Sequence, residues 1–346
     1  MKYLLYSDVH WCEKSSSIQS RGEKFSTRLE YLIKSVNWAE QQAIENKCAA
    51  IICLGDFFDR SDIESEEATA LQKVTWANLP HYFIVGNHEA SNKSLEFNSV
   101  EILRQLPNFT IVTNPTAFGD NMLFLPYIKE NEITSLKEYW DSVFDKPTDK
   151  RIIFSHNSVK GIQMGPVISK EGIDIEEIDS FCTIFLNGHL HNGMKFSNKG
   201  INLGNLTGQN FGEDATRYSH NAFILDTDNN SLESIENPYA FNFYKFEVNT
   251  SNDLNKLKNL KDNAVVSVKC NEQFVTEARE ILKSQNLVYS RVLTIKNIIT
   301  SDMNKIEELV DMQTSHLVKF IKFTKETLDN TEILNQELEE ICKNAE

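Results

Sequence analysis

The stretch LNGHLHNG, residues 186–193, sets two histidines one residue apart at the end of the apolar run CTIFL, residues 182–186. Taken alone, two histidines in a loop rich in Gly and Asn are more often part of a turn than a pair of ligands. A short apolar run bounded by turn residues is typical of a buried strand. The stretch therefore raises the question of whether other predicted strands also end in polar side chains.

Short apolar runs of the same kind recur along the chain and alternate with helical patterns. They are too short for helices and rich in β-branched or aromatic residues, which predicts buried strands. The predicted strands are residues 2–7, 49–54, 82–85, 121–127, 151–155, 182–186, 201–206 and 221–226. The predicted helices are residues 27–47, with Thr27 and Glu30 as a capping box, 64–78 and 94–106. This βαβ-rich order predicts a layered α/β domain with helices covering the sheets.

Five of these predicted strands lead directly into polar residues that can bind metal ions. The segments are Asp8-Val9-His10, Gly55-Asp56, Gly86-Asn87-His88-Glu89, Ser155-His156-Asn157 and Gly188-His189-Leu190-His191. Because the carboxyl ends of strands in open α/β sheets form the crevice where ligands bind, we expect these segments to converge. Oxygen donors mixed with imidazoles suit Mn²⁺, Fe²⁺ or Zn²⁺, and seven ligands are too many for one tetrahedral ion. The donor set predicts two metal ions that share a bridging carboxylate.

Each of these segments also has an ordinary structural interpretation. An Asp at a strand end is commonly a helix cap or a turn residue, Gly-Asn-His is commonly a turn, and a single half-buried histidine is more often hydrogen-bonded than a ligand. The metal interpretation rests on their co-occurrence, since five of the eight histidines fall at predicted strand ends. The other three, His81, His220 and His316, lie in no such context and are predicted to be structural.

Composition and charge narrow the functional classes. With 346 residues, 40% of them hydrophobic and 25% charged, the chain can bury a sizeable core. We expect it to fold as one large domain with one or two small ones. No apolar run approaches the ~20 residues of a membrane span, so we expect no binding to a membrane. Asp8 comes too early for a signal peptide, and the six cysteines form no CxxC pair. We therefore expect a cytoplasmic protein. A formal net charge of −15 argues against an independent nucleic-acid binder, because such affinity comes mainly from Lys and Arg contacts to phosphates.

The chain changes character after residue 249. The polar stretch SNDLNKLKNLKDN, residues 251–263, predicts a boundary, and it is followed by a predicted strand at 264–269, a helix at 274–284 and a strand at 287–296. Residues 301–346 are predicted to form two helices, 302–324 and 331–344, with an apolar stripe and eleven acidic residues against five lysines. The stripe is either core or a docking surface for another protein. The predicted organisation is a main domain at 1–249, a small domain at 250–300 and a helical segment at 301–346.

Taken in order, the five polar segments resemble the signature of the calcineurin-like metallophosphoesterases, with Gly55-Asp56-Phe57-Phe58-Asp59-Arg60 as the second block. The resemblance covers residues 1–226 and implies the four-layer α/β/β/α sandwich of that family. Carried over by position, it assigns Asp8, His10 and His191 to one metal ion and Asn87, His156 and His189 to the other, with Asp56 bridging them. It also implies that His88 is catalytic and stabilises or protonates the departing oxygen. Asp59 and Arg60 remain open between a role at the site and a surface salt bridge.

A narrower resemblance concerns the segment after the last of these histidines. INLGNLTGQNFGED, residues 201–214, with Gly204, Thr207, Phe211 and Glu213, is similar to a glycine-rich segment followed by Phe-x-Glu in SbcD-type DNA repair nucleases. Those nucleases carry a small capping domain and dock onto an SMC-like ATPase through C-terminal helices. The short chain is most similar to the recombination endonuclease subunits of large-tailed bacteriophages. The resemblance implies a DNA nuclease that uses two Mn²⁺ ions in double-strand-break processing and recombination with an SbcC-type partner.

Other functions stay open at this point. A metallophosphoesterase that hydrolyses phosphomonoesters, cyclic nucleotides or phosphoproteins would use the same metal ions. A non-catalytic scaffold is a further alternative, against which the complete donor set and His88 argue. The sequence also departs from the SbcD-type pattern, with Trp11-Cys12 in place of Leu-Gly and Glu89 in place of Asp, although no proposed ligand is changed. Whether the chain forms a homodimer is open as well.

Overall fold

The computed structural model describes residues 1–91, 94–164 and 167–295. Residues 1–294 form one compact unit. The helices predicted at 302–324 and 331–344, and with them the docking segment and His316, lie outside the described residues. Among the helices in the described ranges, none has the length and apolar composition of a membrane span.

The first sheet carries the N-terminal strands. Its order is β16-β15-β1-β2-β3-β6, with β1, β2, β3 and β6 parallel and β15 and β16 antiparallel to their neighbours. The register pairs Tyr3 with Ala50 and Tyr6 with Cys53, so β1 and β2 end side by side. The strands are β1 (Lys2–Tyr6), β2 (Ala50–Cys53), β3 (His81–Ile84), β6 (Phe109–Val112), β15 (Asn221–Asp226) and β16 (Ser231–Glu236).

The second sheet carries the strands from the middle of the chain. Its order is β13-β14-β12-β9-β8-β7, and its four central strands are parallel. The register aligns Leu125, Ser155 and Asn187, so three strands reach the same edge together. The strands are β7 (Thr116–Phe118), β8 (Met122–Leu125), β9 (Ile152–Ser155), β12 (Ile184–Asn187), β13 (Met194–Lys195) and β14 (Gly200–Asn202).

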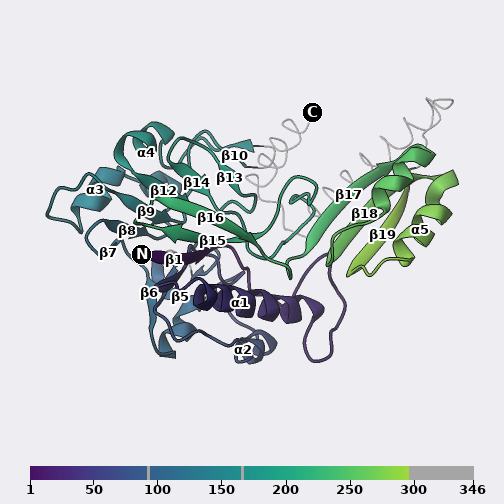
Figure 1. The fold of residues 1–346 in the computed structure, drawn as a ribbon, viewed down its shortest axis with the longest axis horizontal. Coiled ribbons are helices and arrows are strands. Elements are labelled where there is room, and N and C mark those ends of the chain that lie inside the picture. Colours follow the sequence, from purple (N-terminus) through teal and green to yellow (C-terminus); the bar gives the residue numbers. More distant parts are fainter. Residues whose placement is uncertain (92–93, 165–166, 296–346) are drawn as a thin grey trace, which may run out of the picture. The chain divides into compact units, whose positions relative to one another are not determined.

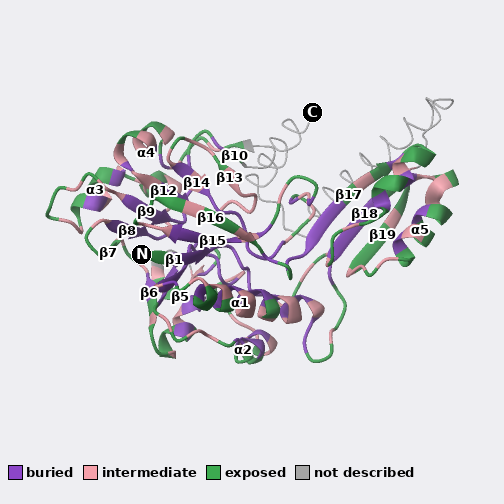
Figure 2. Ribbon diagram, in the orientation of Figure 1, coloured by how far each residue is buried: buried purple, intermediate pink, exposed green. Residues whose placement is uncertain are grey.

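The two sheets and their helices form four layers (Figure 1). Alternate residues of β1 face opposite ways: Leu4 and Tyr6 pack with α1 (Thr27–Glu45) and α2 (Ser65–Leu71), while Leu5 packs toward the second sheet. On the other side, Phe185 packs under α3 (Leu136–Asp141) and α4 (Ile175–Phe181). Figure 2 shows the buried residues concentrated in the strands, as side chains on both faces of a central sheet require. The predicted α/β/β/α sandwich is confirmed.

The helical prediction for residues 94–106 is wrong. The structure has a short hairpin of β4 (Ala90–Ser91) and β5 (Ser94–Asn98), followed by a 3-10 helix, Ser99–Gln105. A second small hairpin joins β10 (Gln163–Met164) and β11 (Val167–Ile168). The sequence misleads here because the buried Val100 and Leu103 of the 3-10 helix have a three-residue spacing that an amphipathic α-helix also shows.

Two helix termini also differ from the predictions. The N-cap of α1 is Ser26, whose hydroxyl accepts a hydrogen bond from Leu29 N at 3.2 Å, and not Thr27. Helix α2 ends at Leu71, seven residues before the predicted end at 78. The backbone N–H groups of Thr75 and Ala77 donate to side chains of α1, at 2.7 and 2.8 Å, instead of continuing the helix. Tertiary contacts with α1 therefore set where α2 stops.

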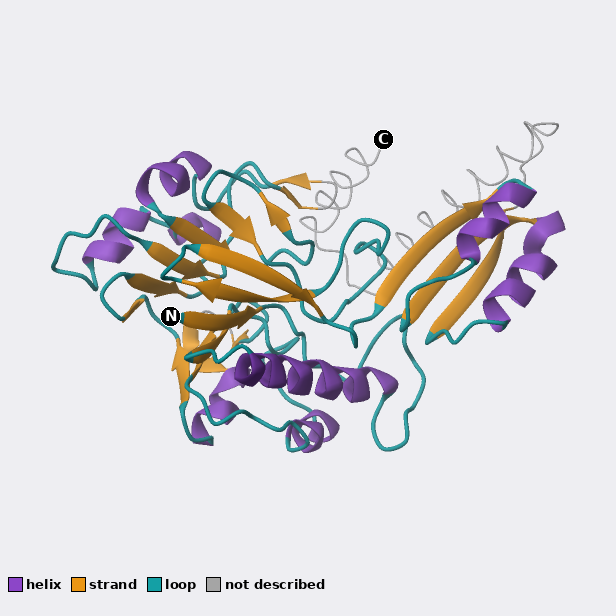
Figure 3. Ribbon diagram, in the orientation of Figure 1, coloured by secondary structure: helices purple, strands orange, loops and turns teal. Residues whose placement is uncertain are grey.

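A third sheet follows the sandwich strands in the chain (Figure 3). It has the order β17-β18-β19 and packs against α5 (Val275–Lys283). Its strands are β17 (Asn242–Val248), β18 (Ala264–Asn271) and β19 (Tyr289–Ile295). Sequence analysis assigned β17 to the main domain ending at residue 249, but this strand pairs in parallel with β18, so the small sheet begins at Asn242. The pairing is non-local, and the composition of β17 does not distinguish it from a sandwich strand.

The layer between the two large sheets gives the first prediction. Leu186 has 0% of its surface exposed and lies in the core between the sheets. Leu186→Ala removes buried methyl groups and leaves a cavity, so the free energy of unfolding should fall by about 2–5 kcal/mol. The free energy of unfolding is measured by urea denaturation, with circular dichroism as the signal.

The matched control is Ile44→Ala, because Ile44 lies in α1 with 51% of its surface exposed. This substitution should change the free energy of unfolding by no more than about 0.5 kcal/mol. Equal losses for the two variants would contradict the layer assignment.

Candidate metal centre

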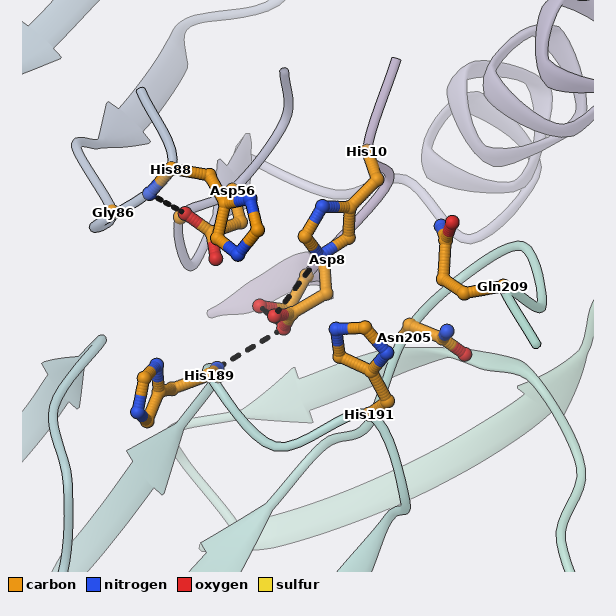
Figure 4. Close-up of polar contacts among 12 residues, drawn as sticks. Asp8, His10, Asp56, Gly86, His88, His189, His191, Asn205 and Gln209 are labelled. Carbon is orange, nitrogen blue, oxygen red and sulfur yellow. Dashed lines mark hydrogen bonds and ion pairs between the residues drawn. The ribbon is translucent and has the colours of Figure 1, made fainter. Parts of the chain in front are cut away.

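The carboxyl ends of five strands, β1, β2, β3, β9 and β12, bring the predicted site residues together. Figure 4 shows Asp8 at the centre of the labelled group, with His10 and His191 on one side and His189 on the other. The described residues form three groups of side chains whose potential ligand atoms lie within 4.8 Å of one another. Two consist of predicted ligands, namely Asp8 with His10 and His191, and Asp56 with His156 and His189, and the third joins His10 to Asp59 and His88. Asn87 and His88 lie beside them. All eight residues singled out from the sequence therefore share one site.

The first group, which we call cluster one, consists of Asp8, His10 and His191. Asp8 Oδ1 and His10 Nε2 are 3.9 Å apart, and both atoms are buried without a hydrogen-bond partner. A buried polar atom without a partner costs free energy, and nearly all such atoms in native proteins are satisfied. A cation between these two atoms would satisfy both, so the cluster fits a divalent metal ion.

The second group, cluster two, consists of Asp56, His156, His189 and the amide of Asn87. His156 Nε2 lies 3.1 Å from Asp56 Oδ2 and 3.2 Å from Asn87 Oδ1. The same amide oxygen lies 2.9 Å from His189 Nδ1. The structure groups Asp56 with cluster two alone, and its role as a bridge between two ions stays a prediction.

The position of the single proton on the neutral His189 ring also indicates a cation site. Burial, with the neighbouring His156 as a further cause, lowers the pKa of His189 to about 4, so the ring is neutral near pH 7. Ser158 Oγ donates to Glu130 at 3.0 Å and lies 3.2 Å from His189 Nε2, so it accepts the Nε2 proton. The lone pair of Nδ1 then faces the lone pairs of the Asn87 oxygen, and the two acceptor atoms repel each other. A cation bound between them would remove this repulsion.

Outer hydrogen bonds hold the other three histidines in one tautomer. His10 Nδ1 donates to Asp59 Oδ1 at 2.9 Å, His191 Nδ1 donates to Glu213 Oε1 at 2.9 Å, and His156 Nδ1 donates to the Leu54 carbonyl at 2.6 Å. Each bond leaves Nε2 as the atom that can bind a metal ion, which is how metal-binding histidines are usually oriented.

Two of these outer residues were not among the predicted site residues. Asp59, for which the sequence allows either a role at the site or a salt bridge, orients His10. Glu213, which the sequence marks only as part of the segment 201–214, orients His191. Glu213 also accepts hydrogen bonds from Asn205 Nδ2 at 3.0 Å and from the Gln209 backbone at 2.7 Å. Arg60 forms a salt bridge to Glu67 at 2.8 Å, as the salt-bridge alternative expects, but Glu67 is buried and the pair does not lie on the surface.

Electrostatics favours an ionised carboxylate in cluster two. Burial raises the pKa of Asp56, but His156 and other nearby histidines outweigh it and hold that pKa well below its usual range. Burial lowers the pKa of His156, while the adjacent Asp56 outweighs this effect and raises it to about 9. Glu89, which stands where SbcD-type nucleases have Asp, is fully buried, and burial together with the charge of Asp56 raises its pKa to about 8.

The backbone at the site is held in unusual conformations. Asp8, His10, Asp56 and His189 have positive φ angles of 52°, 48°, 50° and 76°, which residues other than glycine seldom adopt. The first two strand ends are joined by hydrogen bonds from Asp8 N to the Gly55 carbonyl and from His10 N to the Asp56 carbonyl, both 3.0 Å. A Cβ at Gly86 would lie 2.2 Å from Asp56 Oδ1, so only glycine allows this approach.

His88 lies at the rim of the site and belongs to neither cluster. Its backbone N–H donates to Asp56 Oδ1 at 3.0 Å, and its Nδ1 donates to the Asp59 carbonyl at 2.8 Å. Its side chain is 43% exposed, and its ring stands perpendicular to that of His10 with the centroids 4.7 Å apart. The free Nε2 is thus available to a molecule that enters the site.

The two described histidines that were predicted to be structural, His81 and His220, lie outside both clusters. His81 is buried, stacks on Phe109 at 4.2 Å between ring centroids and lies 3.0 Å from Glu40. His220 is buried and donates through Nδ1 to the Asn205 carbonyl at 3.2 Å.

Comparison with solved structures gives weak overall similarity. An archaeal phosphodiesterase is 13% identical with a TM-score of 0.35, and the match covers 68% of this chain and 99% of that one. A dimetal phosphatase from Danio rerio is 14% identical with a TM-score of 0.38 over the same shares, 68% and 99%. A 5′-nucleotidase from Candida albicans SC5314 is 15% identical with a TM-score of 0.36, covering 68% of this chain and 51% of that one. No curated protein matches the chain in sequence.

Comparison with family models gives a direct assignment. Residues 1–193 match the model described as calcineurin-like phosphoesterase. The match spans more than half of the 346 residues and includes every residue of the two clusters. The chain therefore belongs to the calcineurin-like phosphoesterase family, whose members use divalent metal ions.

Proposed function

We propose that this protein is a two-metal DNA nuclease that acts in double-strand-break processing and recombination together with an SMC-like ATPase. Membership of the phosphoesterase family supports phosphoester hydrolysis as the reaction. The single observation that carries the two-metal mechanism is the pair of adjacent donor clusters, in which Asp8 Oδ1 and His10 Nε2 are buried without partners. The proposed metal ion is Mn²⁺, because mixed carboxylate, amide and imidazole donors suit borderline divalent ions.

Each cluster would hold one ion. Asp8, His10 and His191 would bind the first, and the remaining donors, Asn87, His156 and His189, would bind the second, with Asp56 shared between them. When bound, the ions supply positive charge to the phosphate oxygens and lower the pKa of water at the site, so that a nucleophile exists near neutral pH.

The side chains of the protein perform the other tasks. Asp59, Glu213 and the Leu54 carbonyl retain the Nδ1 protons of three histidines, which keeps their Nε2 atoms available. Asp56 stays ionised because its pKa is held low. His88 is fixed by its Nδ1 bond to the Asp59 carbonyl, so its Nε2 faces the site. In the imidazolium form, in which both ring nitrogens carry protons, Nε2 would donate its proton to the departing oxygen and leave the neutral ring.

The segment that resembles SbcD-type nucleases supports DNA as the substrate. Thr207 Oγ1 donates to the Val9 carbonyl at 3.0 Å, between the first two proposed ligands, and Glu213 orients His191. Phe211 contacts Phe243 of β17 with ring centroids 5.2 Å apart. The segment thus connects cluster one with the three-stranded sheet that we propose to be the capping domain. The acidic net charge of −15 agrees with a partner that supplies most of the DNA affinity.

The substrate class is tested by comparing DNA with small phosphate esters. With Mn²⁺, the protein should release nucleotides from duplex DNA or cut it, and EDTA should abolish the activity. Gel analysis of an end-labelled duplex, beside spectrophotometry with p-nitrophenyl phosphate and a cyclic nucleotide, measures both. Turnover of the small esters without any cleavage of DNA would favour the alternative, a phosphoesterase of another specificity.

Metal binding is tested by stability. Mn²⁺ at a hundred times its Kd should raise the free energy of unfolding by about 2.7 kcal/mol for each ion bound, because the ions bind only the folded protein. Asp56→Asn should lose most of this gain, since it removes a charge from cluster two. Glu64→Gln is the control, because Glu64 is a surface carboxylate that pairs with Lys14. A full gain in Asp56→Asn would contradict the metal assignment.

The role of His88 is tested by separating binding from chemistry. His88→Gln should keep the Mn²⁺-dependent gain in stability but lower kcat on DNA by roughly 10²–10⁴-fold, the usual contribution of a general acid. The loss should be smaller with bis(p-nitrophenyl) phosphate, whose leaving group needs no proton. Equal losses on the two substrates would argue that His88 does not act on the leaving group.

A further inference from the structure

Arg28 is a buried cation without a direct ion pair. It lies in the first turn of α1 with 2% of its surface exposed, and burial lowers the pKa of its guanidinium. No carboxylate in the described residues forms an ion pair with it, whereas the exposed Arg21 pairs with Glu66 at 2.8 Å. A buried charge is costly unless a group of opposite charge compensates it. The carboxylates of Asp59, Glu213 and Glu67 oppose the lowering of this pKa without pairing directly with the guanidinium. An anion from outside the chain that binds Arg28 directly would compensate the charge further.

The hydrogen bonds of Arg28 use one side of its guanidinium. Nη2 donates to the His10 carbonyl at 3.1 Å and to Gln209 Oε1. Gln209 is itself held by bonds from its Nε2 to the Val9 carbonyl and to Thr207 Oγ1, both 3.1 Å. Nε is buried without a partner. The guanidinium is thus fixed in orientation while its Nε–H donor remains without an acceptor.

The position of Arg28 near the N-terminus of α1 adds to the electrostatic cost of its positive charge. The N-terminus of a helix carries partial positive charge, which favours acidic side chains there and disfavours cations. Arg28 stands one residue after the first residue of the 19-residue helix α1. Burial and the helix dipole therefore both oppose a positive charge at this position, and an anion beside it would reverse both effects.

A cavity of about 220 Å³ lies beside this guanidinium. It is lined by Arg28 and Gln209, by His10 and His191 of cluster one, and by His88. The Asp59 carboxylate also lines it but already accepts the Nδ1 proton of His10. None of the residues of cluster two lines this cavity. Figure 4 shows Gln209 on the same side of the site as His10 and His191. A group bound here would contact cluster one but would not lie between the two clusters.

We propose that Arg28 binds a backbone phosphate of the DNA strand adjacent to the phosphate that is hydrolysed. The proposal rests on the nuclease function proposed above. A phosphodiester offers two unesterified oxygens to the planar guanidinium donors, a geometry that arginine recognises well. The hydrolysed phosphate has to contact both clusters, so the phosphate in this cavity is its neighbour. Arg28 is then a substrate-positioning residue that distinguishes a polynucleotide from an ester with a single phosphate.

The test compares one phosphate with several. Arg28→Gln should raise KM for a short oligonucleotide by roughly 10- to 100-fold with little change in kcat, since a hydrogen bond to a charged group is lost from binding. For bis(p-nitrophenyl) phosphate, kcat/KM should stay within about twofold. Arg28→Lys should recover part of the loss, because it keeps the charge without the planar donors. Arg21→Gln is the control, since Arg21 is exposed and paired, and should match the unsubstituted protein on both substrates.

Binding without turnover gives an independent readout. In EDTA at low ionic strength, the Kd for a fluorescent oligonucleotide, measured by anisotropy, should rise in Arg28→Gln by a factor similar to that in KM. Thermal unfolding checks that both Arg28 variants are folded. If Arg28→Gln does not fold, the comparison is made with Arg28→Lys. An unchanged KM and Kd, or no binding by the unsubstituted protein in EDTA, would overturn the proposal.

The outcomes also separate this proposal from the nuclease function. Equal losses of Arg28→Gln on both substrates would show that Arg28 contacts the hydrolysed phosphate or supports His10, and would overturn the assignment of a neighbouring phosphate. Hydrolysis of bis(p-nitrophenyl) phosphate without any action on DNA would overturn the nuclease function instead.

Discussion

Buried donor atoms without protein partners are the constraint on which the rest of this structure depends. Asp8 Oδ1 and His10 Nε2 are buried and unsatisfied, and the neutral His189 ring faces the amide oxygen of Asn87. Keeping such atoms together costs free energy, so the fold has to hold them firmly. Parallel strands in two packed sheets provide this, because their carboxyl ends reach a common edge and each delivers donors from its own loop. The four-layer core fixes the strands, and the strands fix the site.

The loops at this edge have little freedom. Four proposed ligand residues have a left-handed backbone conformation, and Gly86 allows the Asp56 carboxylate to approach where any Cβ would collide with it. Outer partners then fix the rings, since Asp59 and Glu213 each hold the Nδ1 proton of one histidine. These contacts act in the same direction: backbone strain, close packing and hydrogen bonding leave a single arrangement of donor atoms. Such preorganisation is what a metal-dependent hydrolase requires before its substrate arrives.

The charge next to cluster one is opposite in sign to the net charge of the chain. The chain is acidic overall, with a net charge of −15, and yet it buries Arg28 unpaired beside cluster one. Burying an arginine without a direct ion pair costs free energy of folding, and an anion bound in the adjacent cavity would offset this cost. The family assignment accounts for phosphoester chemistry, and the cavity lined by Arg28 and His88 bears on which phosphoester is bound.

The fold class could be predicted from the sequence alone, and so could the grouping of the eight candidate side chains. Hydrophobic periodicity identified the strands, and the five polar segments that follow them contain all eight side chains that the structure brings together, because strand direction alone decides where a strand end lies. Local patterns failed where non-local contacts decide. The helix predicted at 94–106 is a hairpin and a 3-10 helix, α2 stops at a contact with α1, and β17 joins the third sheet through its pairing with β18. The roles of Asp59 and Glu213 as outer partners, and the burial of Arg28 without one, likewise emerged only in three dimensions. Burial and pairing of a single charged side chain depend on neighbours that are distant in the chain, and only the tertiary structure specifies them.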